Sequence, residues 1–381
     1  MSTTRKIFVV VERRADYSRF RPILEELRKD AFFEIFLVVT GMCLLEAHGG
    51  YVNYIKDDGL NISAEVPMFL AGGSDSGAEM VLSMSRVMSG LVDELKKAKP
   101  DIVLSGFDIG ANFAVTVAAA HMNIPVAHIQ GGEVTGSIDE SIRHAMSKFA
   151  HIHFPATELS KQRLIKMGEN PGSIYVVGCP SIDVLVNTPY LPKEDIEKEF
   201  GVDLSRPVVM MIQHPVTTEC MSSFDQINET IAAVRELDIQ AVALLPNNDA
   251  GYSNIIHELK SSGIKWYPDL PTVKFVNLFR NVWALAGNSS AGIHETPTLK
   301  IPAINIGTRQ KGRERAGNVL DVPYDRNEIK SAIKKALFDE DFRTAVKSMP
   351  NPYGDGTSAK KIVSLLRSVP LEGVIQKVFY E

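Results

Sequence analysis

The chain has 381 residues, with 41 Lys and Arg against 46 Asp and Glu, so its formal net charge at pH 7 is −5. This mild acidity argues against a nucleic-acid-binding protein, because affinity for the phosphate backbone needs a clustered basic excess. The three cysteines, Cys43, Cys179 and Cys220, are far apart in the sequence, which argues against a disulfide scaffold or a cysteine-based zinc site. The length suggests two large domains.

The N-terminal residues run directly into an apolar, strand-like segment and show no signal-peptide pattern. No apolar stretch approaches the roughly 18 residues that a membrane-spanning helix needs. We therefore expect a cytoplasmic protein that makes no contact with a membrane.

Short apolar runs alternate with amphipathic stretches through the first half of the chain. The runs predicted as strands are Ile7–Val11, Ile35–Val39, Ile102–Leu104, Val126–Ile129 and Tyr175–Val177. Their continuous hydrophobicity is typical of strands that are buried on both faces. Between the first two runs, apolar residues from Phe20 to Leu27 recur at helical spacing. This β-α-β order predicts a parallel sheet with helices on both faces.

The second half repeats this rhythm. Its predicted strands are Val208–Ile212, Ala241–Leu245, Val282–Ala286 and Ala303–Ile306. The Pro-containing segment Asn187–Pro192, followed by a charged helix over Lys193–Phe200, is the predicted linker. The fold class is therefore α/β, with two doubly wound domains. Ligands of such sheets bind beyond the carboxyl ends of the strands, so we expect the site in the cleft between the domains.

Charged residues follow the first predicted strand, where a helix begins. Arg14 and Ser18 lie in this segment, and a guanidinium beside a helix N-terminus suits a diphosphate. The simpler alternative is that Asp16 or Ser18 only caps the helix.

A second polar cluster follows the strand at Val126–Ile129. Around Gly131 and Gly132 it contains Gln130, the carboxylates Glu133, Asp139 and Glu140, and the Arg143–His144 pair. The carboxylates could act as a general acid or base if their surroundings separate their pKa values. Alternatively, Asp139 and Glu140 only complement the dipole of a helix N-terminus.

Polar residues also follow the strands of the second half. His214 comes directly after a strand and is fixed by Pro215, and Asn247 follows the next strand. The loop Gly287–Glu295 is rich in small and hydroxyl residues, and its N–H groups with Ser289 and Ser290 could cradle a pyrophosphate. Glu295 could accept hydrogen bonds from ribose hydroxyls. The loop is no Walker A motif, and no Gly-x-Gly-x-x-Gly follows the first strand, which argues against a nicotinamide cofactor.

Together these segments resemble the hydrolysing UDP-N-acetylglucosamine 2-epimerases of sialic-acid and legionaminic-acid biosynthesis. The blocks that are similar are Arg14–Ser18, Gly131–Gly136, Asp139–His144, Gln213–Thr218, Gly287–Ser290 and Gly307–Gln310. The resemblance covers nearly the whole chain.

The resemblance implies a GT-B-like fold with two Rossmann-like domains and no metal or cofactor. It implies a sugar-side domain over 1–186, a nucleotide-side domain over 187–360, and a helix over 361–381 that packs back on the first domain. The expected ligands are a UDP-sugar substrate and UDP, and the expected assembly is a homodimer or homotetramer.

The resemblance also implies roles for individual residues. The residues expected to bind substrate are Arg14, Ser18, Gln130, Arg143, His214, Asn247, Ser289, Ser290, Glu295 and Arg309. Those expected to act in catalysis are Asp108, Glu133, Asp139 and His214. The implied reaction is anti elimination of UDP from a UDP-2-acetamido sugar, followed by addition of water to the glycal. Arg143, one turn after Asp139, is expected to orient that carboxylate.

Two segments depart from the family pattern. Family members end the third strand in His-Gly-Asp-Arg, whereas this chain has Ser105-Gly106-Phe107-Asp108, and Gln130 stands where Glu or His is common. The sugar could be UDP-N-acetylglucosamine or UDP-2,4-diacetamido-2,4,6-trideoxyglucose. Two alternatives remain open, namely a GT-B glycosyltransferase and a nucleotide-sugar-binding protein that has lost catalysis.

Overall fold

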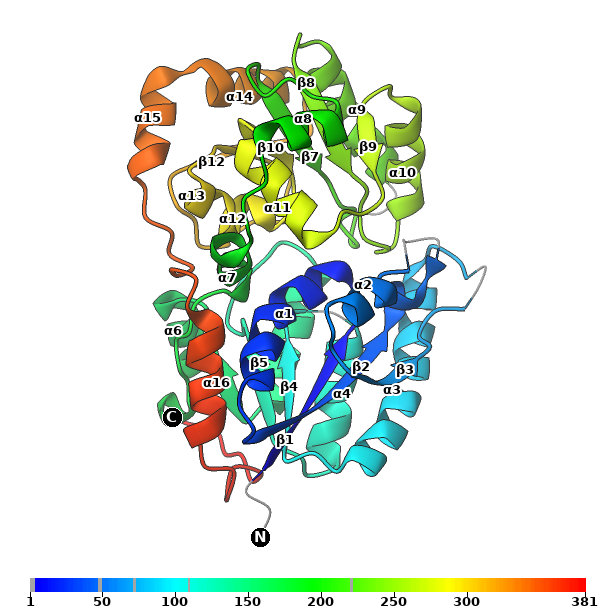
Figure 1. Ribbon diagram of the computed structural model, residues 1–381, viewed down its shortest axis with the longest axis vertical. Coiled ribbons are helices and arrows are strands. Elements are labelled where there is room, and N and C mark those ends of the chain that lie inside the picture. Colours follow the sequence, from blue (N-terminus) through cyan, green and yellow to red (C-terminus); the bar gives the residue numbers. More distant parts are fainter. Residues whose placement is uncertain (1–3, 47–49, 71–72, 109, 220–221) are drawn as a thin grey trace.

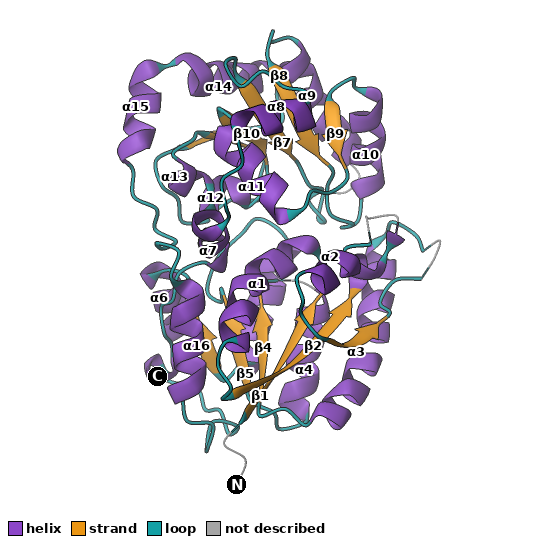
Figure 2. Ribbon diagram, in the orientation of Figure 1, coloured by secondary structure: helices purple, strands orange, loops and turns teal. Residues whose placement is uncertain are grey.

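The computed structural model describes residues 4–46, 50–70, 73–108, 110–219 and 222–381. Ile109 and Cys220 lie outside these ranges. Two parallel sheets, each between layers of helices, lie one above the other in Figures 1 and 2.

The first sheet consists of six parallel strands in the order β3-β2-β1-β4-β5-β6. Their bounds are Arg5–Val11 (β1), Phe33–Thr40 (β2), Ile62–Val66 (β3), Ile102–Gly106 (β4), Val126–Ile129 (β5) and Ile152–Phe154 (β6). This is the strand order of the Rossmann fold, with the switch point between β1 and β4. The carboxyl ends of β1, β4 and β5 therefore lie together at one edge of the sheet.

Helices cover both faces of this sheet. The helices of this half are Arg14–Arg28 (α1), Val52–Asp57 (α2), Gly77–Ala98 (α3), Gly110–His121 (α4), Ile138–Phe149 (α5), Glu158–Lys166 (α6) and Pro180–Asn187 (α7). Ile7 and Val9 of β1 pack in the core under α1, whereas Phe8 and Val10 pack in the core under α3 and α4. The strand is thus buried on both faces, as its continuous hydrophobicity predicts.

The second sheet has six parallel strands in the order β12-β11-β10-β7-β8-β9. Their bounds are Val208–Ile212 (β7), Gln240–Leu244 (β8), Lys265–Tyr267 (β9), Ala284–Gly287 (β10), Ala303–Ile306 (β11) and Val319–Val322 (β12). It repeats the topology of the first sheet, and the two sheets confirm the prediction of two Rossmann-like units in a GT-B-like arrangement.

The remaining helices surround the second sheet or return to the first. They are Lys193–Phe200 (α8), Ser223–Arg235 (α9), Tyr252–Ser261 (α10), Thr272–Asn281 (α11), Ala291–His294 (α12), Thr296–Leu299 (α13), Arg326–Phe338 (α14), Glu340–Ser348 (α15) and Ser358–Ser368 (α16). The charged stretch predicted as a helix after the linker is α8. Among the helices of the described segments, none is both long and apolar enough to cross a membrane.

One predicted strand is wrong. Tyr175–Val177 forms no strand, although the Tyr175 and Val177 N–H groups donate to the carbonyls of His153 and Pro155. This segment continues past the end of the short β6 as an extended chain with few pairing partners. β6 itself and β3 were not among the predicted strands, because β6 has only three residues and β3 has no continuous apolar run.

The chain passes between the two units twice, and the two passages lie side by side. Near Gly178 it leaves the first unit, near Gly354 it returns, and the Cys179 N–H donates to the Tyr353 carbonyl at 2.7 Å. After the return, α16 packs against α1, with Ile362 and Leu366 in the core of the first sheet (Figure 1). The division at residues 186 and 360 stays a prediction.

Candidate active site

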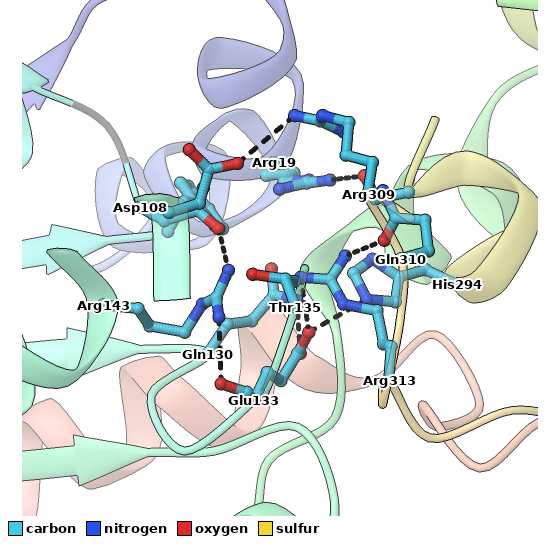
Figure 3. Close-up of a pocket in the computed structure, with 13 residues that line it drawn as sticks. Arg19, Asp108, Gln130, Glu133, Thr135, Arg143, His294, Arg309, Gln310 and Arg313 are labelled. Carbon is cyan, nitrogen blue, oxygen red and sulfur yellow. Dashed lines mark hydrogen bonds and ion pairs between the residues drawn. The ribbon is translucent and has the colours of Figure 1, made fainter. Parts of the chain in front are cut away.

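Two joined pockets lie between the carboxyl ends of the two sheets. The larger, here called the serine-loop pocket, has about 1020 Å³ of unfilled space and is bordered by Ser289, Ser290 and the residues around them. The smaller, here called the carboxylate pocket, has about 370 Å³ and is drawn in Figure 3. Residues from both units line each pocket. Five residues line both and so mark the junction: Arg19, Asp108, Asp139, Ser290 and Arg309.

Every predicted site residue lines one of these pockets. The serine-loop pocket contains Arg14, Ser18, His214, Asn247, Ser289, Ser290, Glu295 and Arg309. The carboxylate pocket contains Asp108, Gln130, Glu133, Asp139 and Arg143, and also Ser290 and Arg309. The structure thus brings together residues that are nearly 300 positions apart in the sequence.

The serine loop owes its position to a tight turn after β10. Gly287 has φ +134°, and a Cβ there would lie 2.1 Å from the carbonyl oxygen of Ile212, so only glycine fits. Asn288 then ties the loop to the end of β7, accepting from the His214 N–H at 2.7 Å and donating to the His214 carbonyl at 2.8 Å. The next two residues, Ser289 and Ser290, therefore face the pocket in a fixed position.

Glu295 is buried in the wall of the same pocket. Its Oε2 has no hydrogen-bond partner among the residues that the structure describes. A buried carboxylate oxygen without a donor is costly, so it marks a place where a ligand could donate a hydrogen bond. Opposite, the guanidinium of Arg14 pairs with Asp269 at 2.5 Å and lies over the ring of Phe275.

His214 is buried and neutral. Burial, together with the charges of Arg309 and Arg13, lowers its pKa well below the ordinary value. Its Nδ1 accepts a hydrogen bond from the Asn247 N–H at 3.2 Å, so the proton of the neutral ring resides on Nε2. His214 can therefore donate a hydrogen bond from Nε2 without carrying a charge.

Glu133 lies at the centre of a buried network that joins the two units (Figure 3). Its Oε2 pairs with Arg313 at 3.1 Å and His294 at 3.2 Å, and its Oε1 accepts from Gln130 Nε2 at 2.9 Å. Burial opposes ionisation of Glu133, but the two cationic partners outweigh it and lower its pKa. In return Glu133 raises the pKa of His294 to about 9 against the effect of burial. Both groups are therefore charged at neutral pH.

Asp108 is held by Arg143. The Arg143 guanidinium pairs with Asp108 Oδ2 and also donates to the Glu133 carbonyl at 2.9 Å. Burial would raise the pKa of Asp108, but Arg143 and Arg313 lower it to about 2. Asp108 is thus a fixed anion at the junction of the pockets.

Asp139 has a different environment from the other two carboxylates. Burial and the neighbouring charge of Asp108 raise its pKa, although Arg309 lies 3.3 Å away. The expectation that Arg143 orients Asp139 is wrong, because the hydrogen bonds recorded for Arg143 lead to Asp108 and Glu133. Glu140 turns back instead and accepts from the Thr135 N–H at 2.6 Å. Of the carboxylates Glu133, Asp108 and Asp139, Asp139 is the one whose pKa is raised.

Two residues at this edge of the first sheet have an unusual backbone. Phe107 (φ +69°) and Gln130 (φ +61°) follow the neighbouring strands β4 and β5, and both occupy the left-handed region that non-glycine residues seldom adopt. Neither position is a helix C-cap. Backbone strain of this kind concentrates at functional sites, and here it directs both side chains into the carboxylate pocket.

Several contacts hold the two units together across the cleft. Arg13 pairs with Asp249 at 3.0 Å, and both side chains are largely buried. Farther out, Asp75 accepts from the Gly251 N–H at 2.7 Å and the Ser253 N–H at 3.0 Å, so the first unit caps the start of α10 in the second. The two units are therefore joined across the cleft at more than one place.

Comparison with known proteins places this geometry in a family. Residues 25–367 match the sequence profile described as UDP-N-acetylglucosamine 2-epimerase. The chain belongs to the UDP-N-acetylglucosamine 2-epimerase family. This confirms the resemblance drawn from the sequence blocks.

Two relatives of this chain are named for a hydrolysing 2-epimerase activity. The chain is 35% identical to a hydrolysing UDP-N,N'-diacetylbacillosamine 2-epimerase of Legionella pneumophila, over 97% of this chain and 98% of that protein. It is 30% identical to a hydrolysing GDP/UDP-N,N'-diacetylbacillosamine 2-epimerase of Campylobacter jejuni, over 99% of both. This family member is thus an enzyme of the hydrolysing 2-epimerase type.

A solved epimerase has the same fold. UDP-GlcNAc 2-epimerase from Neisseria meningitidis, crystallised with UDP-GlcNAc, superposes with a TM-score of 0.82 at 22% identity, covering 95% of this chain and 99% of that one. At this identity the similarity establishes the shared architecture.

Sequence reasoning assigned no individual role to several residues that line this epimerase's pockets, although Thr135, His294 and Gln310 lie within its motifs: Arg19, Thr135, Phe275, His294, Gln310 and Arg313. Arg19 lies one helical step past Ser18 and donates to Ser290 Oγ across the cleft at 3.2 Å. Gln310 is the last residue of the predicted block Gly307–Gln310, and extending that block by three residues would have found Arg313. Nothing in the sequence indicated that Phe275 lines a pocket, because it has the spacing of an ordinary apolar residue in an amphipathic helix.

Proposed function

We propose that this enzyme converts a UDP-2-acetamido sugar and water into the free 2-epimer and UDP. The observation that supports this most directly is the junction of the two pockets. There the hydroxyl of Ser290 and the guanidinium of Arg309, suited to a diphosphate, lie beside the carboxylates Asp108 and Asp139, one of which has a raised pKa. A sugar bonded to a diphosphate at this junction has its C1 and C2 next to those carboxylates.

UDP would occupy the serine-loop pocket. Ser289 and Ser290 face the pyrophosphate, together with Arg309. Glu295 Oε2 accepts from a ribose hydroxyl, which supplies the donor that this buried oxygen lacks within the described residues. Phe275 offers a ring face for the base, next to Arg14.

In the first step, a carboxylate removes the C2 proton while the C1–O bond breaks and its electron pair passes to the diphosphate. The new C1–C2 double bond gives a glycal. Because His214 is neutral with its proton on Nε2, it donates a hydrogen bond to the departing diphosphate, and Arg309 supplies positive charge. The fixed cations and donors stabilise charge where it develops.

In the second step, the oxygen of water bonds to C1 as one of its O–H bonds breaks, and Asp108 passes the released proton to C2 from the face opposite to the original one. We assign removal of the C2 proton in the first step to Asp139, because its pKa is raised. Glu133 has both oxygens engaged by Gln130, His294 and Arg313, so we assign it to holding the pocket in shape rather than to proton transfer.

The sugar we favour is UDP-2,4-diacetamido-2,4,6-trideoxyglucose, which is UDP-N,N'-diacetylbacillosamine. The support is the 35% and 30% identity to relatives named for that substrate. The family member named UDP-N-acetylglucosamine 2-epimerase from Neisseria meningitidis is 28% identical. The product would then serve nonulosonic-acid synthesis of the legionaminic type.

The test is NMR of the purified enzyme with UDP-N-acetylglucosamine and with UDP-2,4-diacetamido-2,4,6-trideoxyglucose in deuterated water. We expect free 2-epimerised sugar, UDP, and deuterium at C2 of the product. Release of UDP without epimerisation, or transfer of the sugar to an added acceptor, would overturn the proposal. No reaction with either sugar would favour a protein that binds nucleotide sugars without turning them over.

A further inference from the structure

Four buried polar atoms of residues that line the carboxylate pocket lack a hydrogen-bond partner within the parts of the chain that the structure describes: Gln130 Oε1, Thr135 Oγ1, His294 Nδ1 and Arg313 Nε. Two of these, Gln130 Oε1 and Arg313 Nε, are an acceptor and a donor of fixed orientation. Gln130 is 3% exposed and Arg313 is 8% exposed, so neither group is hydrated by bulk solvent. Unsatisfied groups of this kind are rare in folded proteins, and in a pocket they indicate the polarity of the ligand.

Glu133 fixes the orientation of both groups. Gln130 Nε2 donates to Glu133 Oε1, and because a carboxylate only accepts, the amide cannot be flipped and Oε1 must be the free end. Arg313 Nη2 pairs with the other carboxylate oxygen, and its Nη1 donates to Gln310 at 3.1 Å, which leaves Nε. By binding both side chains, Glu133 orients them so that Gln130 presents an acceptor and Arg313 a donor to the same pocket.

These two groups lie on the side of the pocket away from the diphosphate. Gln130 and Arg313 line the carboxylate pocket but not the serine-loop pocket, whereas Asp108 and Asp139 line both. If C1 and C2 of the sugar lie at the junction, the opposite side of the pyranose ring, with C4 and C6, points toward Gln130 and Arg313.

The aromatic ring of Phe107 also lines this pocket. Phe107, held in its strained conformation at the end of β4, packs at an angle against Phe20, with ring centroids 5.1 Å apart, and the guanidinium of Arg19 lies over its ring, 5.0 Å from the centroid. The part of the ring that lines the pocket suits methyl groups better than hydroxyl groups, since it offers them no hydrogen-bond partner.

From this juxtaposition we infer that Gln130 and Arg313 select an acetamido group at C4 of the sugar. The amide N–H donates to Gln130 Oε1, the amide carbonyl accepts from Arg313 Nε, and Phe107 packs against the methyl groups. The inference rests on the proposed function and deepens it, because it makes these residues the determinants of specificity between a 4-acetamido and a 4-hydroxyl sugar.

The test compares kcat/KM for UDP-2,4-diacetamido-2,4,6-trideoxyglucose and UDP-N-acetylglucosamine in the parent enzyme and in Gln130→Met. Methionine has similar length but no strong acceptor. We expect the parent to prefer the diacetamido sugar and Gln130→Met to reduce that preference at least about tenfold, as loss of a buried hydrogen bond requires. The ratio of the two values is informative because a general disturbance of the pocket would lower both.

Gln310→Met is the matched control. Gln310 lines the same pocket, but both ends of its amide are engaged, by Asn288 at 2.8 Å and Arg313 at 3.1 Å. It should lower both values in similar proportion. If Gln130→Met does not fold, Arg313→Lys provides the second test, because it keeps a cation beside Glu133 but lacks Nε–H, and it too should reduce the preference.

The outcomes are distinguishable. A parent that epimerises both sugars with equal kcat/KM, or a preference that survives both Gln130→Met and Arg313→Lys, overturns the inference and leaves the proposed function standing. A parent that turns over neither sugar overturns both. A preference that falls in these two variants and persists in Gln310→Met supports the inference.

Discussion

Glu295 provides the most direct test of the nucleotide assignment at the scale of a single residue. Its buried Oε2 lacks a donor among the described residues, and ribose supplies one. Glu295→Ala should weaken UDP binding about tenfold or more, because hydrogen bonds to charged groups contribute roughly 1.5–3 kcal/mol. Isothermal titration calorimetry measures the affinity, and Glu295→Gln, which keeps one carbonyl acceptor, should fall between. Equal affinities in all three proteins would show that UDP does not use this carboxylate.

Asp139 is expected to dominate proton transfer. Asp139→Asn should slow both C2 hydrogen exchange and UDP release by about 100-fold or more, the usual contribution of a general acid or base. Because its pKa is raised and the base form must be deprotonated, kcat/KM of the parent should fall as pH decreases, starting above the ordinary titration range of a carboxyl group.

Glu140→Gln is the control for this prediction. Glu140 is the neighbouring carboxylate, but it faces the Thr135 N–H rather than the pocket junction. The variant Glu140→Gln should still show the decrease in kcat/KM at low pH. If Glu140→Gln instead abolishes the decrease in kcat/KM at low pH while Asp139→Asn keeps it, the roles of the two carboxylates are reversed.

The limits of sequence reasoning are visible in these same residues. Adjacent helical positions point about 100° apart, so the sequence indicates that only one of Asp139 and Glu140 faces the cleft easily. It cannot supply the partner of Asp139, because Arg309 comes from the other unit, 170 positions later. The i+4 neighbour Arg143 was the only partner that local spacing could suggest.

At the scale of elements, α10 depends on the opposite unit for its N-cap. Its own N-cap residue, Gly251, has no side chain, and Asp75 accepts from the N–H groups of Gly251 and Ser253 instead. Asp75→Ala should lower the free energy of unfolding by about 0.5–2 kcal/mol, the usual cost of a lost N-cap. Urea unfolding followed by circular dichroism measures this change.

The control for the cap is Asp325, which accepts from N–H groups at the start of α14 within one unit. Asp325→Ala should have a similar cost in stability. Only Asp75→Ala should also speed dissociation of UDP, because Asp75 joins the units across the cleft. If both variants release UDP at the parent rate, the cap does not contribute to keeping the pockets closed.

A strand could be predicted from the sequence where its apolar run was buried and also paired along its whole length. Val208–Ile212 is both a continuous apolar run and a strand with the same bounds, because all five residues are buried between helix layers. Tyr175–Val177 has a similar apolar pattern but pairs only with the last residues of β6 and the residue after it, so it has no continuous partner strand. Apolar composition reports burial, and only pairing with a neighbour makes a buried segment a strand.

At the scale of the whole molecule, the buried pair of Glu133 and His294 should make the joining of the two units depend on pH. Glu133 raises the pKa of His294 to about 9, so the pair contributes its full stabilisation below the unfolded value of about 6.5. That contribution should decrease as pH rises from there through about 9. Urea unfolding of the parent and of His294→Gln across this range should show their difference shrinking with increasing pH.

Glu133→Gln is the companion variant, because it removes the negative charge that raises the pKa of His294. Its stability should lack this pH dependence above 6.5. If the parent and His294→Gln keep a constant difference from pH 6 to pH 10, the ion pair does not titrate as the geometry indicates.

The pockets themselves could be placed from sequence only in outline. The rule that ligands bind at the carboxyl ends of parallel strands located Gln130, His214 and Ser289 correctly at the cleft. The network of Glu133, His294 and Arg313 could not be foreseen, because it forms only when the two units meet. Sequence spacing reports neighbours within a unit and is silent about contacts between units.

The paired passages of the chain at Gly178 and Gly354 determine how the cleft can open. One covalent connection would leave the units free to swivel about any axis, whereas two connections joined by a hydrogen bond leave mainly the rotation that bends both together. Both glycines have positive φ, +91° and +110°, so their backbones are free of the Cβ that would resist such bending. Such a rotation separates the units most on the side far from the two passages, where α10 lies (Figure 1) and where Asp75 accepts from the Gly251 N–H. Molecules would enter and leave the pockets from that side, by a path that the covalent connectivity itself sets.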